Sequence, residues 1–233
     1  MIYLVGIGPG DPELLTVKAV RLIGAADVVF VPQSRDDGRS VAEKIIAPFA
    51  RPKTIEMVHL PMSRERGKVK EQYATLARTM AENDRKGLTQ VFVTLGDPAM
   101  YSTAHYLEGE LLRLKVPYES VPGISSFSLA ANRAHMALGA GRENVGIITM
   151  PDTIESLADA ASSHDTLVVM KVNKRLPVLL NFVREYRPEQ AVLGHCLGMP
   201  DEALFNLLDA IVPTDDIGYF STALIKQGKK SSL

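Results

Sequence analysis

The sequence predicts an α/β protein made of two α/β lobes with a cleft between them. Short runs rich in β-branched residues alternate with longer stretches of helical period, which is the pattern of βαβ units. Glycine and proline gather where several predicted strands end, and α/β sheets bind ligands at that edge. The rhythm changes near Pro122 and Gly123. We therefore expect an N-terminal domain at 1–118 and a C-terminal domain at 119–233.

Local patterns place the elements of the first lobe. Ser40 stands before an apolar helical period and Glu43 follows three residues later, which is the signature of a capped helix start. Pro61 ends one strand, and Gly87 ends the longest helical period. The expected strands are 3–7, 28–31, 55–60 and 91–95, and the expected helices are 13–25, 40–49 and 67–86.

The second lobe repeats this alternation with different spacing. Its apolar runs VGIITM, TLVVMKV, AVLGHCL and FSTALIKQ have the composition of strands. Helices are expected between and beside them at 124–138, 153–162, 174–186 and 201–209.

Composition excludes several classes of protein. The chain has 233 residues, and its 26 basic and 27 acidic residues give a net charge of −1, so no overall field attracts nucleic acid. The single cysteine, Cys196, rules out an intrachain disulfide framework and a cysteine-based zinc cluster, which agrees with a cytoplasmic location. The five histidines lack the spacing of metal ligands. We expect neither a signal peptide nor a membrane span, because no apolar run is long enough.

The first glycine turn, GIGPGD, does not match the two common phosphate-binding motifs. Gly6 and Gly8 fit a dinucleotide fingerprint, but Asp11 occupies the third glycine position and Pro9 removes a backbone donor. A P-loop is excluded because the sequence GK[ST] does not follow. The turn therefore favours a ligand other than a dinucleotide or a phosphate.

Two further loops allow either a binding or a structural role. Asp97, between a glycine and a proline, either receives a polar ligand group or caps a helix beginning at Ala99. Ser125 and Ser126 stand at a helix start, where their hydroxyls either meet ligand oxygens or cap the helix. Each loop alone leaves both alternatives open.

The three loops in this order resemble the tetrapyrrole methylase family. The similarity lies in YLVGIGPGDPELLTVKAVRLIGAADVV, VTLGDPAMYST and VPGISSFSLAA and runs over essentially the whole chain. Within the family, GDP followed by YST, the earlier HLPM and the late VVMKV are most similar to the branch that methylates C20 of precorrin-2 or cobalt-factor II. The resemblance implies a fold that differs from the common Rossmann methyltransferase fold and a methyl donor, S-adenosylmethionine, which leaves as S-adenosylhomocysteine.

The resemblance also implies which residues bind the methyl donor between the two lobes. The implied cofactor-binding residues are Pro9, Leu95, Gly96, Asp97, Met100, Ser125, Ser126, Met170 and Cys196. Such a donor needs apolar walls, hydroxyls and backbone partners more than positive charge. Glycine at Gly8 and Gly96 would let the backbone approach it closely, so that added bulk should close the site.

For the acceptor, the resemblance implies an electron-rich carbon of a tetrapyrrole ring. A proton must leave that carbon after methylation, and a tyrosine, carboxylate, histidine or water could take it. Tyr101 is the catalytic candidate because it follows the cofactor loop. Cations for the acidic arms of the ring are expected among Arg35, Arg39, Arg64, Arg66 and the segment from Lys171 to Arg175.

Two other functions stay open at this point. One is a related methyltransferase that acts on ribosomal RNA or on the modified histidine of an elongation factor, although the neutral charge does not favour RNA. The other is a non-catalytic module that binds S-adenosylmethionine. The family resemblance further implies a homodimer.

Overall fold

The computed structural model describes residues 1–33, 40–60, 66–209 and 217–228. Contacts divide the chain into two compact units, Met1–Ser125 and Ser126–Leu233, and each unit is described by itself. The division falls after β5 (Tyr118–Val121), later than the boundary expected between 118 and 119. The reason is that β5 pairs with the first strand of the chain and so belongs to the first sheet.

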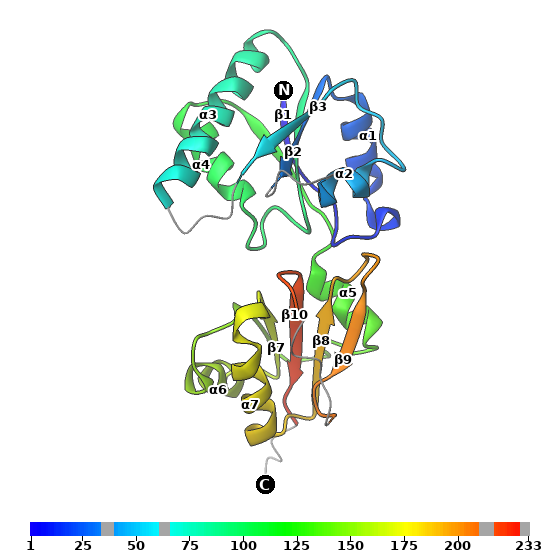
Figure 1. Ribbon diagram of the computed structural model, residues 1–233, viewed down its shortest axis with the longest axis vertical. Helices are drawn as coiled ribbons and strands as arrows, with labels where there is room; N and C mark the ends of the chain where they lie inside the picture. Colours follow the sequence, from blue (N-terminus) through cyan, green and yellow to red (C-terminus); the bar gives the residue numbers. More distant parts are fainter. Residues whose placement is uncertain (34–39, 61–65, 210–216, 229–233) are drawn as a thin grey trace. The chain divides into compact units, whose positions relative to one another are not determined.

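The first unit is a parallel sheet with helices on both faces (Figure 1). Its strands lie in the order β3-β2-β4-β1-β5, and all of its pairings are parallel. Besides β5, its elements are β1 (Ile2–Gly6), η1 (Pro12–Leu14), α1 (Val17–Ala25), β2 (Val28–Gln33), α2 (Val41–Ile46), β3 (Ile55–His59), α3 (Arg66–Arg85), β4 (Gln90–Thr94) and α4 (Ala104–Arg113). Most match the expected ranges within a few residues.

Alternation along the strands of the first unit makes two cores. On β1, Val5 faces α1 and α2 and joins a cluster that includes Ile23 and Ile46. Ile2 and Leu4 join the opposite cluster beneath α3 and α4. Because the strands are buried on both faces, they read as continuous apolar runs in the sequence.

The second unit is a mixed sheet in the order β6-β7-β10-β8-β9. Only β6 and β7 are parallel, whereas β10 runs antiparallel to both β7 and β8. Its elements are α5 (Ser126–Arg133), β6 (Val145–Thr149), α6 (Ile154–Ser162), β7 (Thr166–Met170), η2 (Asn173–Arg175), α7 (Leu176–Tyr186), β8 (Gln190–His195), β9 (Ala203–Asn206) and β10 (Ser221–Lys226).

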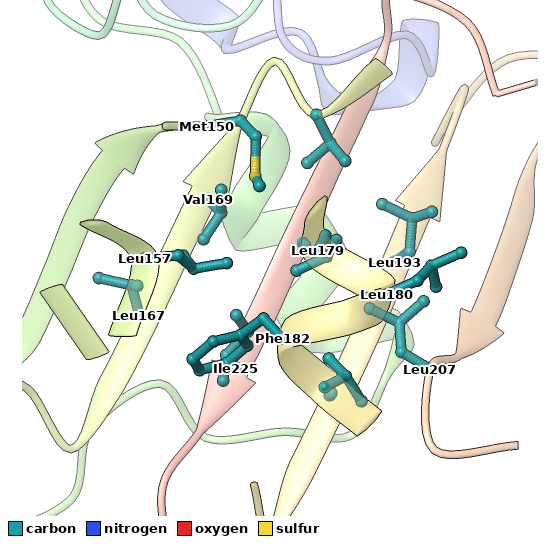
Figure 2. Close-up of a cluster of buried hydrophobic side chains, with 14 of the residues drawn as sticks. Met150, Leu157, Leu167, Val169, Leu179, Leu180, Phe182, Leu193, Leu207 and Ile225 are labelled. Atoms are coloured by element: carbon teal, nitrogen blue, oxygen red, sulfur yellow. The ribbon is translucent and has the colours of Figure 1, made fainter. Parts of the chain in front are cut away.

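One face of the second sheet carries the core of that unit. Figure 2 shows this cluster, in which Phe182 and Leu179 of α7 pack with Val169 of β7 and Ile225 of β10. Helix α5 also contacts strand β10. The second unit therefore holds the residues at the ends of its strands on a rigid, well-packed sheet.

The prediction of a helix at 201–209 is wrong. Residues Ala203–Asn206 form strand β9, which pairs antiparallel with β8, and Phe205 packs against the core of the unit. A four-residue strand with partial alternation is too short for its period to be told from a helical one. The antiparallel pairing with β8 decides the conformation.

Candidate methyl-donor and acceptor site

Four glycines bring the loops after β1, β4 and β5 together, and we call Gly6, Gly8, Gly96 and Gly123 the glycine junction. Where the β1 and β4 ladder ends, the amide of Ile7 donates to the Thr94 carbonyl at 2.9 Å. The amide of Gly8 then donates to the Gly96 carbonyl at 3.2 Å, and the amide of Gly96 donates to the Gly8 carbonyl at 2.7 Å. The two loops are thus held to each other by their backbones.

The glycines of the junction serve two different physical needs. A Cβ on Gly123 would lie 2.2 Å from the Gly96 oxygen, and a Cβ on Gly6 would lie 2.6 Å from the Gly123 nitrogen. These two positions therefore admit no side chain. Gly8 and Gly96 instead have positive φ angles of 75° and 67°, which L side chains rarely adopt.

Gly96 is not crowded by other atoms of the protein. A Cβ on Gly96 would meet no described atom within 4 Å, so the surface above this glycine is open. Gly96 is needed for its backbone conformation, and its open face leaves room for a ligand to approach the loop. Crowding instead occurs at Gly6 and Gly123, where backbone meets backbone.

Asp97 uses both of its carboxylate oxygens inside the first unit. One accepts from the amide of Ala99 at 2.8 Å, and the other accepts from the amide of Gly123 at 3.0 Å. The side chain therefore ties the β4 loop to the β5 loop. The hydrogen bond from Ala99 closes the turn that the Asp-Pro sequence suggested. However, α4 begins at Ala104 and not at Ala99.

The other predicted residues of the first unit lie on the same loops. Pro9 is buried in the β1 loop, whereas Leu95 and Met100 of the β4 loop are half-buried. Leu95 packs against the α1 and α2 core. Tyr101 is 42% exposed and has a φ of 48°, an uncommon conformation for a residue other than glycine. Ser125, the last residue of this unit, is half-buried.

In the second unit, three predicted residues gather where β7 and β8 end and β10 begins. Met170 pairs with Thr222, and the hydroxyl of Thr222 lies 3.1 Å from that of Ser126 at the start of α5. The amide of Cys196 donates to the Phe220 carbonyl at 2.9 Å. We call Ser126, Met170, His195, Cys196, Ser221 and Thr222 the β10 edge.

The β10 edge and the neighbouring Lys171 have backbone conformations that the sequence did not predict. Lys171 and Cys196, each directly after a strand, have φ angles of 60° and 47°. Such left-handed residues cost about 1 kcal/mol or more each and gather at functional sites. Burial, together with the charge of Asp201, raises the pKa of the Cys196 thiol. The sequence did carry one sign of this edge, the two hydroxyl residues Ser221 and Thr222 at the start of a strand.

The expected cations are only partly described. Arg35, Arg39 and Arg64 lie outside the described residues, and for Arg66 only the backbone at the start of α3 is described. Arg175 pairs with Asp152, and Lys174 is exposed. Within the described ranges, no group of three His, Cys, Asp or Glu side chains is placed to hold a metal ion.

No helix within the described residues is both long and apolar enough to cross a bilayer.

The fold is similar to the folds of solved tetrapyrrole methyltransferases. It matches the structure of cobalt precorrin-4 methyltransferase with a TM-score of 0.73 and 26% identity, covering 97% of this chain and 94% of the other. It also matches the uroporphyrin-III C-methyltransferase of Thermus thermophilus, crystallised with S-adenosylhomocysteine, with a TM-score of 0.65 and 24% identity over 97% and 96% of the two chains. The expected α/β fold of the tetrapyrrole methylase type is confirmed.

The sequence comparisons then give the family. Residues 1–211 match the model of the tetrapyrrole (corrin/porphyrin) methylases, and the chain belongs to this family. The cobalt-precorrin-2 C(20)-methyltransferase of Salmonella typhimurium is 30% identical over 97% of this chain and 96% of its own length. The precorrin-2 C(20)-methyltransferase of a Sinorhizobium species is 30% identical over 95% and 93%.

Proposed function

We propose that the protein transfers a methyl group from S-adenosylmethionine to C20 of precorrin-2 or of cobalt-factor II in cobalamin biosynthesis. The observation that carries this proposal is the nearly full-length similarity to relatives that are named for methylation at C20. The open face of Gly96 and the hydroxyls of the β10 edge support it, because they fit a ligand that needs close backbone approach and hydroxyl partners.

The residues proposed to bind the donor belong to the loops described above. In the first unit they are Pro9, Leu95, Gly96, Asp97, Met100 and Ser125, and in the second unit they are Ser126, Met170 and Cys196. Asp97 also holds two of these loops together, because its carboxylate accepts two backbone amides. When bound, the donor supplies an electrophilic methyl group on a sulfonium.

The task left to the protein is mainly alignment. The acceptor carbon must lie behind the methyl group on the line of the bond that breaks, and such positioning alone lowers the barrier by several kcal/mol. The glycine junction suits this task because its backbone hydrogen bonds leave little freedom to the loops. Tyr101 remains a candidate for the proton transfer that completes the reaction.

The test is an assay with methyl-labelled S-adenosylmethionine and either precorrin-2 or cobalt-factor II. We expect the label on C20 of the ring, located by NMR, together with S-adenosylhomocysteine. Label on another ring carbon would refute the C20 assignment. Label found only in ribosomal RNA or in an elongation factor would favour the macromolecular alternative, and donor binding without any transfer would favour a non-catalytic module.

Two properties of the working protein are part of this proposal. The family resemblance supports a homodimer, and the single cysteine supports a reducing, cytoplasmic location. Light scattering after size-exclusion chromatography should give twice the 25.4 kDa mass of the chain. A monomeric mass in the active fraction would contradict the dimer.

A further inference from the structure

A chain of hydrogen bonds at the β10 edge selects one tautomer of the neutral His195 imidazole. The Ser221 hydroxyl donates to the Gly218 carbonyl at 2.6 Å, and its oxygen lies 3.3 Å from Nδ1 of His195. A hydroxyl has only one proton, so Ser221 must accept in its contact with the imidazole. Nδ1 therefore carries the ring proton, and Nε2 carries the lone pair.

The lone pair of Nε2 has only a weak partner. The thiol of Cys196 lies 3.3 Å away, and an S–H group is a poor hydrogen-bond donor. Burial raises the pKa of this thiol, with a further contribution from the charge of Asp201, so the thiol holds its proton. A stronger proton donor can therefore displace the thiol from Nε2 at little cost.

His195 lies at the same end of the sheet as the proposed donor-binding residues of the second unit, and its Nε2 contacts one of them, Cys196. His195 ends β8 and pairs with Ser221 in the register of β8 and β10. The next residue of β10, Thr222, pairs with Met170 and contacts Ser126, so these three side chains lie at the same end of the sheet but on its other face. Among the side chains of the β10 edge, the imidazole of His195 is the one with a basic nitrogen.

We propose that His195 accepts, through Nε2, the proton that leaves the methylated ring carbon, and this inference rests on the proposed function. The ring carbon forms a bond to the methyl carbon while the carbon–sulfur bond breaks and its electron pair goes to sulfur. The C–H bond of the same ring carbon then breaks, its electron pair returns to the ring, and the proton moves to Nε2. Ser221 is a positioning residue that holds the imidazole in the accepting tautomer.

The test compares His195→Gln with wild type in single-turnover assays, using precorrin-2 that carries hydrogen or deuterium at C20. Glutamine keeps hydrogen-bonding groups but has no basic nitrogen. We expect turnover to fall by about 10²- to 10⁴-fold, the range for loss of a general base. The deuterium isotope effect should rise because proton removal becomes limiting, and the affinity for S-adenosylmethionine, measured by calorimetry, should stay unchanged. Ser221→Ala should show a smaller loss in the same direction.

Two further variants give the comparison its controls. His135→Gln makes the same change at an exposed residue beyond α5 and should behave as wild type. His195→Ala should regain turnover when imidazole is added, which a purely structural role for the side chain would not produce.

Wild-type turnover and isotope effect in His195→Gln would overturn the inference. So would a loss of turnover that accompanies weaker donor binding with no change in isotope effect, or an isotope effect that rises in Tyr101→Phe and not in His195→Gln. These results differ from failure of the proposed function, in which the wild-type protein itself places no methyl group on C20.

Discussion

Replacing Gly123 by alanine tests whether the glycine junction is held by backbone packing. The new Cβ would lie 2.2 Å from the oxygen of Gly96 and 2.7 Å from the carbonyl carbon of Gly6. Ordinary van der Waals contact begins near 3.4 Å, so the backbones must separate by about 1 Å. Gly123 has no positive φ, so its replacement by alanine lowers stability only through the crowding around the new Cβ.

The expected cost follows from how little the neighbours can move. The Gly123 amide is bound to Asp97, and Gly96 is bound twice to Gly8. Overpacking costs about 1–3 kcal/mol and occasionally more, and we expect about 3 kcal/mol here because only backbone atoms surround the new group. With an m-value of about 2–3 kcal/mol per M, the urea midpoint of the first unit should fall by about 1–1.5 M.

Two control variants separate crowding from other effects in the same urea titration. Gly24→Ala adds a Cβ in the exposed part of α1 where no described atom lies within 4 Å, and it should leave stability unchanged or raise it by up to about 1 kcal/mol. Gly96→Ala should cost about 1–2 kcal/mol, from its left-handed backbone alone. If Gly123→Ala unfolds at the wild-type midpoint, or costs less than Gly96→Ala, the packing argument is refuted.

Three other outcomes concern stability and its pH dependence. Burial and the nearby Glu108 carboxylate raise the pKa of Tyr118 to about 12. The stability that the neutral phenol contributes is therefore complete below the ordinary tyrosine pKa near 10 and is lost as the pH rises towards 12. Tyr118→Phe should flatten this alkaline decline in urea titrations. The hydrogen bond from Lys53 lowers the pKa of Asp27. The stability that the Asp27 carboxylate contributes is therefore present above the ordinary aspartate pKa and is lost as the pH falls through the lowered value. Asp27→Asn should reduce this loss of stability at acidic pH. Phe182→Ala empties the centre of the second core and should cost about 3–5 kcal/mol by thermal or urea unfolding, more than Phe182→Leu.

The sequence by itself determined the alternation of elements, the fold class and the family. Buried strands such as β4 and β7 are continuous apolar runs, and helices such as α3 have a long period with clear ends, so local chemistry suffices to find them. Gly8 and Gly96 were also recognisable, since turns that need a positive φ select glycine locally. These features depend on residues that are neighbours in the chain.

Only the tertiary structure decided which distant groups meet. The second oxygen of Asp97 finds the amide of Gly123, and the imidazole of His195 finds the hydroxyl of Ser221, because strand pairing places loops and strand ends side by side. The same pairing makes Ala203–Asn206 a strand, against its helical pattern. Hydrogen bonds between distant residues depend on register, and register is set by the burial of whole strands, which no short stretch of sequence specifies.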